Sequence, residues 1–289
     1  WAGQVLADLG ADVIKVERPE VGDDTRTWGP PFLKDQDGNA TREAGYYLCV
    51  NRGKRSVTID LADPDGQRVV RELAAQSDIV LENYKAGTLA RYGLDEASLR
   101  KINPRLIYCS VTGFGQTGPR RDQPAYDFLI QAMGGLMSVT GERDGQPGGG
   151  PQKVGVPIVD LMTGMYTAVA VLAAVARRDE SGVGESIDIA MLDVQVAMLA
   201  NQAMNYLVSG KTPQRNGNAH PNIQPQDVYA CADGDAILVV GNDGQFAKLC
   251  DVLGHAEWAQ DERFATNAQR VRNITALSAM LRHELAQRP

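Results

Sequence analysis

The feature that most constrains the fold is the alternation of short apolar runs with amphipathic helical segments in the first half of the chain. Strand-like runs lie at 12–16, 55–61, 78–81 and 106–111, with helical patterns at 63–76 and 96–102. This alternation predicts parallel strands joined by right-handed crossovers, because each helix must return the chain across one face of a sheet. The sequence therefore predicts an α/β fold with a Rossmann-like parallel sheet. No Gly-x-Gly-x-x-Gly motif opens these helices, so the pattern does not indicate a dinucleotide.

Capping residues and periodicity predict the remaining elements up to residue 209. Asp63 followed by Pro64 is typical of a helix start, with an N-cap and a proline in the first turn. Pro157 likewise begins the most hydrophobic helix, which is expected to reach about residue 178. Further helices are expected at 127–137 and 192–208, and a strand at 186–190.

The character of the sequence changes after Gly210. A loop-like segment at 211–225 precedes a hairpin, with strands at 228–232 and 236–240, and helices begin near 245 and 275. We therefore expect a large domain at 1–209 and a smaller α+β domain at 210–289. Both are expected to be incomplete, because the chain starts inside a helical segment and stops just after another.

Composition and charge limit the class of ligand. The net charge of -7 argues against general nucleic-acid binding. Four scattered cysteines and three histidines without a CxxC pair argue against a metal site. The longest apolar run, 165–176, is too short to span a bilayer, so no membrane partner is expected. Isolated cysteines fit a reducing compartment, the cytoplasm of a bacterium or the mitochondrial matrix of a eukaryote.

Asp160 lies in the first turn of the helix expected after Pro157. Free N–H groups and the helix dipole stabilise a carboxylate there by roughly 0.3–1 kcal/mol, which keeps it ionised as a nucleophile requires. Gly155 and Gly164 on either side are expected to leave room for a bulky acyl group. From position alone, however, an ordinary dipole contact is the better interpretation.

Tyr126 and Asp127 precede an apolar helical segment. Asp127 either caps that helix or positions a second carboxylate, and its place in the sequence does not separate the two interpretations. His220, in a loop rich in Gly and Asn, is interpreted as exposed rather than as part of a substrate site.

Cationic and polar residues follow the ends of two consecutive predicted strands. Arg18, Asn83, Lys85 and Arg91 make up this set. Ligands of open α/β sheets bind at the carboxyl ends of the strands, and Arg and Lys suit phosphates, so the set predicts an anionic ligand. The basic loop 51–55 either contacts phosphates or is a solvated turn.

Seven ordered motifs extend over nearly the whole chain. They are LADLGADVIKVERPEVGDDTR (6–26), NRGKRSVTIDLADPDG (51–66), DIVLENYKAGTLARYGL (78–94), NPRLIYCSVTGFGQTGP (103–119), AYDFLIQAMGGLMSVTG (125–141), VGVPIVDLMTGMYTAVAVLAA (154–174) and GNAHPNIQPQDVYACADGDAILVVGNDGQF (217–246). Together they resemble the class III CoA-transferases, of the CaiB/BaiF type. The resemblance implies that the carboxylate of Asp160 attacks an acyl-CoA thioester and that coenzyme A, a substrate, is exchanged through mixed-anhydride and aspartyl-CoA intermediates, with no permanent cofactor.

The resemblance also implies site residues and an assembly. The catalytic residues it implies are Asp160, Tyr126 and Asp127. The CoA-binding residues it implies are Arg18, Ile59, Asp60, Leu61, Ala62, Asn83, Tyr84, Lys85, Arg91, Gln123, Pro124, Ala125 and Tyr126. The family fold is an interlocked homodimer, whose first strand and C-terminal part this chain lacks.

The small domain departs from one branch of the family. Residues 220–223 (HPNI) stand where formyl-CoA transferases have a Gly-rich loop. The sequence of the small domain is more similar to the branch that uses succinyl-CoA and dicarboxylic acids such as glutarate. Two alternatives remain. A 2-methylacyl-CoA racemase of the same fold has a His where this chain has Tyr126, a poor base. A catalytically silent CoA-binding protein is disfavoured by the presence of Asp160.

Overall fold

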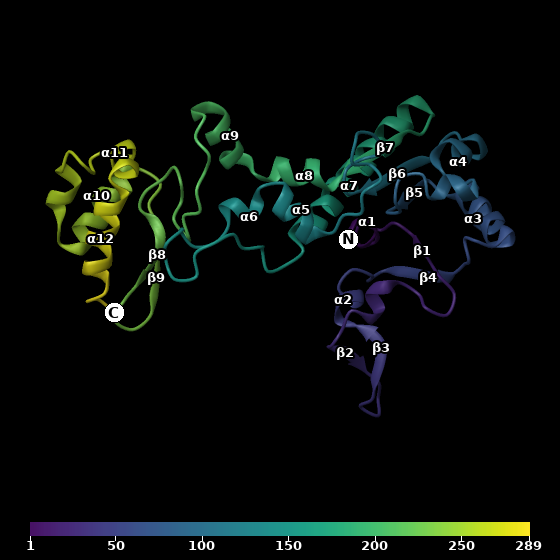
Figure 1. Ribbon diagram of the computed structural model, residues 1–289, viewed down its shortest axis with the longest axis horizontal. Helices are drawn as coiled ribbons and strands as arrows, with labels where there is room; N and C mark the ends of the chain where they lie inside the picture. The colour runs from purple at the N-terminus through teal and green to yellow at the C-terminus, as the bar shows by residue number, and fades with distance from the viewer. The chain divides into compact units, whose positions relative to one another are not determined.

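The computed structural model describes residues 1–289 and divides into two compact units, described separately below (Figure 1). The first unit comprises Trp1–Leu136 and Val154–Met204, and the second comprises Met137–Lys153 and Asn205–Pro289.

The unit boundary differs from the domain boundary expected at 209/210. The observed boundary lies between Met204 and Asn205, and the segment 137–153 belongs to the second unit rather than to the large domain. The cause is long-range pairing, because the Gly217 N–H donates a hydrogen bond of 3.1 Å to the Gly141 carbonyl. Periodicity along the chain carries no information about such a contact.

Parallel strands form the framework of the first unit. Strand β1 (Val13–Glu17) pairs with β4 (Lys54–Thr58), and β5 (Ile79–Glu82), β6 (Ile107–Thr112) and β7 (Ser186–Ala190) pair in that order. The α/β class is thus confirmed, although the strands belong to two parallel sheets and not to one. The central strand β6 is buried over almost its whole length, as expected for a parallel strand covered on both faces.

Helices and short elements surround these sheets. They are α1 (Ala2–Asp8), η1 (Asp24–Thr27), β2 (Phe32–Lys34), β3 (Ala40–Ala44), α2 (Gly45–Leu48), α3 (Pro64–Gln76), η2 (Leu89–Tyr92), α4 (Glu96–Ile102), α5 (Asp127–Met133), α7 (Ile158–Ser181) and α8 (Met191–Met198). The boundary between the units falls within α6 (Leu136–Val139) and within α9 (Ala200–Ser209). Asp63 caps α3, accepting a hydrogen bond of 2.8 Å from the Asp65 N–H. The antiparallel β2–β3 hairpin was not predicted, because its short strands show little apolar alternation.

Helix α7 is the longest element, with 24 residues. By length and composition it passes the test for a membrane span, so the argument from the short run 165–176 is wrong. In the first unit it packs against α1, β6, β7 and α8. Val159, Ala168 and Val171 are among its buried residues. Core helices of soluble proteins can have the same length and apolar composition.

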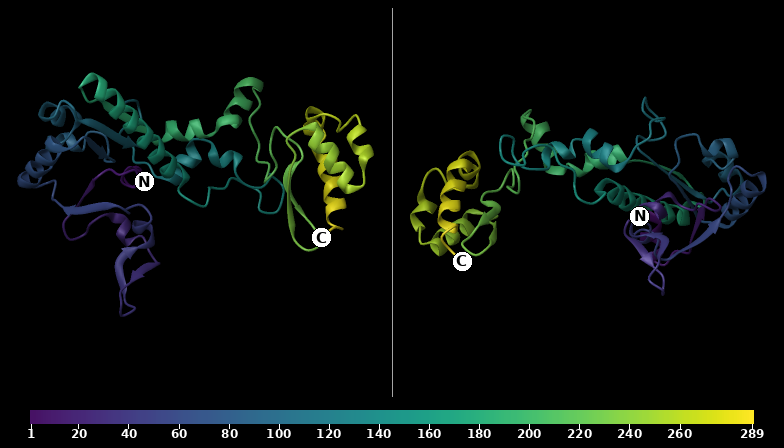
Figure 2. Two further views of the ribbon diagram at one scale, coloured as in Figure 1. Left: turned by 180° about the vertical axis from the view of Figure 1, so that it is seen from behind. Right: turned by 60° about the horizontal axis from the view of Figure 1, so that its bottom comes forward.

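The second unit packs three helices on one side of a hairpin (Figure 2). Its elements are β8 (Gln226–Ala230), β9 (Asp235–Val239), α10 (Asp243–Leu253), η3 (Ala256–Gln260), α11 (Asn267–Arg272) and α12 (Ile274–Leu285). The core is a cluster of apolar side chains, and the charged side chain of Arg270 is also fully buried in this unit. The Arg270 guanidinium donates to the Gln224 and Phe264 carbonyls and pairs with Asp243 at 2.7 Å, so each of its nitrogens is satisfied.

Candidate active site

Asp127 lies in the first turn of α5, yet its carboxylate accepts hydrogen bonds from the first turn of another helix, α7. Its Oδ2 accepts the backbone N–H of Val159 at 2.8 Å and lies 3.4 Å from the N of Asp160. These N–H groups have no partner within α7, because they belong to its first turn. The interpretation that Asp127 caps its own helix is wrong, because it caps α7 instead and so lies beside Asp160.

Asp160 is a carboxylate whose pKa is raised well above its ordinary value. The residue is exposed as a whole, but its carboxyl group is surrounded by protein atoms. This burial raises the pKa of Asp160 to about 6, and the charge of Asp127 acts in the same direction. The helix start was expected to stabilise the ionised form of Asp160, but burial and the charge of Asp127 outweigh that effect. Asp127 also accepts the N–H groups of Val159 and Asp160 on which that expectation depended.

The two glycines near Asp160 differ in what surrounds them. A Cβ on Gly155 would meet nothing within 4 Å, so this position is open as expected. A Cβ on Gly164 would lie 2.8 Å from the Trp1 Cβ and 3.0 Å from the Ala2 nitrogen. Gly164 is therefore needed for the close approach of α1 to α7, and the expectation that it makes room for an acyl group is wrong.

The segment Gln123–Tyr126 leads into α5 from the carboxyl end of β6. A Cβ on Gly113 would lie 2.1 Å from the Ala125 Cβ, so the glycine after β6 fixes the path of this segment. Gln123 and Pro124 are exposed, and Tyr126 is 69% exposed. The segment thus presents its side chains to solvent beside the helix start that carries Asp160.

The polar residues expected at the strand ends are brought together in part. Arg18 pairs with Asp24 at 2.6 Å, and the Asn83 amide donates to the Val111 carbonyl at 2.6 Å. Burial raises the pKa of Tyr84, and the charge of Arg18 opposes that shift, so the ends of β1 and β5 are close enough to interact. Lys85 and Arg91 are exposed.

The segment 59–62 continues directly from β4. The buried Ile59 donates its N–H to the Glu17 carbonyl at 2.9 Å, and the Asp60 carboxylate accepts the Ala62 N–H at 2.8 Å. Leu61 is half-buried. The segment is therefore held beside the end of β1, where Arg18 follows Glu17.

The cations of the basic loop 51–55 already have partners within this chain. Arg52 forms an ion pair with Asp8, and Arg55 forms one with Asp12. The Lys54 ammonium donates to Asn51 at 3.1 Å, and burial together with the charge of Lys15 lowers its pKa to about 8. These pairings favour the structural interpretation of the loop over a phosphate site.

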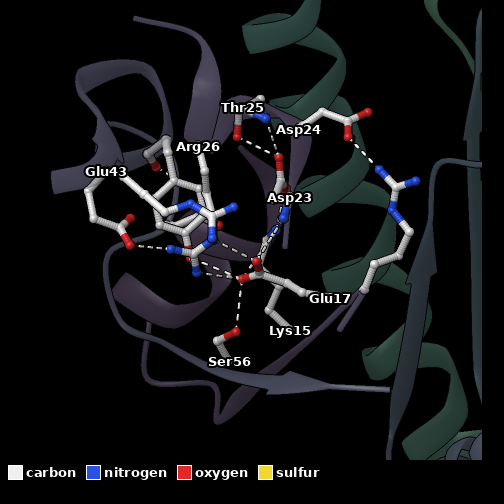
Figure 3. Close-up of polar contacts among 12 residues, drawn as sticks. Lys15, Glu17, Asp23, Asp24, Thr25, Arg26, Glu43 and Ser56 are labelled. Atoms are coloured by element: carbon white, nitrogen blue, oxygen red, sulfur yellow. Dashed lines mark hydrogen bonds and ion pairs between the residues drawn. The ribbon is translucent and has the colours of Figure 1, made fainter. Parts of the chain in front are cut away.

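A buried ionic cluster around Glu17 was missed by the sequence analysis. The Glu17 carboxylate accepts hydrogen bonds from Arg26 at 2.8 and 3.0 Å, Tyr47 at 3.0 Å, Ser56 at 2.8 Å and the Asp23 N–H at 2.9 Å. Figure 3 shows these contacts converging on Glu17 at the end of β1. They tie the loop after Arg18, α2 and β4 to one carboxylate.

The charges in this cluster are strongly stabilised. Hydrogen bonds from Arg26 and the other donors lower the pKa of Glu17 to about 2, although burial acts in the opposite direction. Burial and the hydrogen bond to Glu17 raise the pKa of Tyr47 to about 12. Arg26 also pairs with Glu43, and Lys15 pairs with Asp23. The only sequence signal was an acidic residue at the end of an apolar strand, which by itself does not distinguish a buried anion from an exposed one.

A second polar cluster closes the carboxyl end of the three-stranded sheet. Ser110 donates to Glu82, and the Gln116 amide donates to the Ser110 hydroxyl at 2.5 Å. The Gln116 N–H donates to Asp188 at 2.8 Å. Burial raises the pKa of Glu82, and the charge of Asp188 acts in the same direction. The cluster anchors the turn that follows β6.

His220 lies in the second unit and caps its own turn. Its Nδ1 accepts the N–H groups of Asn222 at 3.0 Å and Ile223 at 3.1 Å. No group of three or more His, Cys, Asp or Glu side chains in the structure is arranged to hold a metal ion.

Comparison with known proteins agrees on one family. The profile of CoA-transferase family III matches residues 1–289. Succinate–glutarate CoA-transferase of Agrobacterium fabrum is 58% identical over 94% of this chain and 66% of its own length. Succinyl-CoA:glutarate CoA-transferase of Mus musculus is 43% identical over 99% of this chain and 63% of its own length.

A solved structure agrees with the sequence comparisons. The crystal structure of a CaiB/BaiF family protein from Brucella suis superposes with a TM-score of 0.84 at 53% identity, covering 100% of this chain and 74% of that one. The chain thus spans 66% and 63% of the lengths of the two enzymes above. Because the family profile matches residues 1–289 and the fold and sequence agree over that range, this protein belongs to CoA-transferase family III, the CaiB/BaiF family.

Proposed function

We propose that the full-length protein transfers coenzyme A from succinyl-CoA to a dicarboxylate such as glutarate, through a covalent intermediate on Asp160. The observation that carries the proposal is the placement of Asp160 beside Asp127 at the start of α7, with a pKa of about 6. Such a carboxylate is ionised at neutral pH but more basic than usual, and nucleophilicity rises with basicity. The relatives named for succinyl-CoA and glutarate support the substrates.

The proposed exchange balances without any further reactant. The Asp160 carboxylate attacks the thioester carbonyl of succinyl-CoA and expels CoA thiolate, which leaves a mixed anhydride of succinate and Asp160. The thiolate attacks the aspartyl carbonyl, releases succinate and forms an aspartyl-CoA thioester. The acceptor carboxylate then displaces CoA to give a second anhydride. CoA attacks the acceptor's carbonyl of this anhydride, which releases the new acyl-CoA and restores Asp160.

The other site residues take supporting roles in this proposal. Asp127 caps α7 and, together with burial, raises the basicity of Asp160. Tyr126 presents an exposed phenol at the start of α5. The CoA phosphates and ribose are proposed to lie along the strand ends, where cations are available. The proposed CoA-binding residues are Arg18, Ile59, Asp60, Leu61, Ala62, Asn83, Tyr84, Lys85, Arg91, Gln123, Pro124, Ala125 and Tyr126.

The proposal includes an interlocked homodimer. Met165, Tyr166, Val169 and Leu172 on α7 are large apolar residues exposed in this chain, and such a face favours cover by further protein surface. Light scattering on the full-length protein should give the mass of two chains, and the mass of one chain would contradict the dimer.

A reducing compartment, either the cytoplasm or the mitochondrial matrix, is also proposed. The four cysteines are free, and burial raises the pKa of Cys109 to about 12 and that of Cys250 to about 11. Thiols held protonated in this way are inert and need no disulfide for their role in the core.

The test is to trap the intermediate. The full-length protein is incubated with succinyl-CoA alone, quenched and digested, and the peptide that carries Asp160 is examined by mass spectrometry. We expect an acyl or CoA adduct on that peptide, and none in Asp160→Asn. Unaltered turnover in Asp160→Asn, together with no adduct in the wild type, would contradict the proposal that Asp160 is the nucleophile.

A deuterium-exchange assay with a methylacyl-CoA, run beside the trapping experiment, separates the two alternatives. A racemase would exchange deuterium at C2 of a methylacyl-CoA without moving CoA to an added acid. A silent CoA-binding protein would bind succinyl-CoA and yield neither an adduct nor exchange.

A further inference from the structure

Gln131 links Asp127 to the chain that leads into α7. It lies one turn after Asp127 on α5 and is fully buried. Its amide nitrogen donates to the Asp127 Oδ1 at 2.6 Å, and its amide oxygen accepts the Val154 N–H at 2.9 Å. One side chain therefore contacts both the carboxylate that caps α7 and the segment that precedes this helix.

These contacts leave Asp127 a single useful orientation. Its Oδ1 is held by Gln131 while its Oδ2 accepts the Val159 N–H at 2.8 Å. Without the Gln131 amide, the carboxylate is free to rotate about its terminal torsion, which has a broad energy minimum. The Val154 N–H would at the same time lose the buried Gln131 oxygen as its acceptor.

We propose that Gln131 is a positioning residue for the chemistry of Asp160, acting through Asp127 and through the segment 154–157. Gln131 does not touch the reacting carboxylate. It holds the Asp127 carboxylate and the Val154 backbone at the same time, so that the first turn of α7, with Asp160, keeps one position. The inference deepens the proposed function and rests on it, since it assigns a role in the reaction of Asp160.

Gln195 provides the structural comparison. It is also a fully buried glutamine, and it lies on α8, which packs against α5. In contrast to Gln131, neither its amide nitrogen nor its amide oxygen has a hydrogen-bond partner in the structure. Gln195 therefore serves as a matched control, because it shares the burial of Gln131 but not its hydrogen-bond partners.

The experiment compares Gln131→Met, Gln131→Glu and Gln195→Met in the full-length protein. Gln131→Met keeps the volume and removes both hydrogen bonds. We expect kcat for CoA transfer from succinyl-CoA to glutarate to fall about tenfold to hundredfold, because misplacement of a reacting group costs rates of this order. The KM for succinyl-CoA should change less than twofold, since the CoA-binding residues are untouched. Gln195→Met should keep kcat within about twofold, since it removes no hydrogen bond.

Gln131→Glu adds a pH signature that a merely structural role would not produce. A protonated Glu donates to Asp127 as Gln does, whereas an ionised Glu repels it, and the charges of Asp127 and Asp160 raise the pKa of the new group. Tyr46, the other titratable side chain that interacts with both acids, stays protonated because its pKa is raised. The activity of Gln131→Glu relative to wild type should therefore be at least about tenfold higher at pH 6 than at pH 8.

The outcomes distinguish the inference from the function beneath it. Wild-type kcat in Gln131→Met, an equal loss in Gln195→Met, or a flat pH ratio in Gln131→Glu would overturn the positioning role. Absence of CoA transfer in the wild type, or full activity in Asp160→Asn, would instead overturn the proposed function. Where Gln131→Met fails to fold by circular dichroism, the pH ratio of Gln131→Glu decides.

Discussion

The carboxylate of Asp127 accepts the backbone N–H of Val159 at 2.8 Å and thereby caps the helix that carries Asp160. This contact occupies an N–H group that would otherwise stabilise an acid in the first turn of the helix. Burial raises the pKa of Asp160, and the negative charge of Asp127 acts in the same direction. The arrangement has a direct consequence for the pH dependence of the reaction.

The first prediction concerns that pH dependence. The value of kcat/KM should rise with pH through an apparent pKa of about 6, because Asp160 must lose its proton to act as a nucleophile. Asp127→Asn removes a neighbouring negative charge, so the acid limb should move to lower pH. The measurement is a pH–rate profile from pH 4.5 to 8, with Asp65→Asn on α3 as the control. An acid limb that stays in place in Asp127→Asn would contradict the coupling.

The second prediction concerns the exposed cations at the strand ends. Lys85→Ala and Arg91→Ala should each raise the KM for succinyl-CoA about threefold to fivefold, which is about 0.5–1 kcal/mol for an exposed charge pair. The kcat should be unchanged, and the difference should shrink at high salt because of screening. Steady-state kinetics at two ionic strengths provide the measurement. Lys101→Ala, at an exposed position of α4, should leave KM unchanged, and an equal effect there would show that the site lies elsewhere.

The third prediction concerns the buried carboxylate of Glu17. Glu17→Gln should lower the free energy of unfolding at pH 7 by about 2 kcal/mol, because it removes the charged partner of the half-buried Arg26 guanidinium. The pKa of Glu17 is depressed from 4.5 to about 2 by Arg26 and the other donors. Its contribution to stability is therefore fully present above pH 4.5 and is lost as the pH falls toward 2.

Urea unfolding between pH 3 and pH 7 checks this prediction. The stability of the wild type should fall more steeply toward acid pH than that of Glu17→Gln. Glu72→Gln removes an exposed partner of Arg68 on α3 and should cost less than about 0.5 kcal/mol. Parallel curves for wild type and Glu17→Gln would show that the carboxylate is not held in its charged form by this cluster.

The fourth prediction compares two glycines. Gly113→Ala places a Cβ 2.1 Å from the Ala125 Cβ, so the segment that ends at Tyr126 must shift. Overpacking of this kind costs about 1–3 kcal/mol. We expect a raised KM for succinyl-CoA and a lower melting temperature. Gly155→Ala meets nothing within 4 Å and should leave the melting temperature unchanged. Equal behaviour of the two variants would contradict the close approach.

Local pattern was sufficient for many elements of the fold. The helix at 96–102 and the strand at 186–190 are found with the predicted bounds, and Asp63 caps α3 as expected. These elements were predictable because their signals, apolar periodicity and capping chemistry, act between residues close in sequence. The β2–β3 hairpin was missed because its strands have little local signal.

The candidate site was predictable only as a set of residues. The sequence by itself determined the α/β class, the order of the family motifs and the presence of Asp160 and Asp127. Only the tertiary structure decided that Asp127 caps α7 and that the start of α1 occupies the space beside Gly164. It also decided that Glu17 is the centre of a buried ionic cluster. The physical reason is that hydrogen bonds and close packing join residues far apart in sequence. Which N–H, cation or side chain reaches a given group therefore depends on how the elements pack.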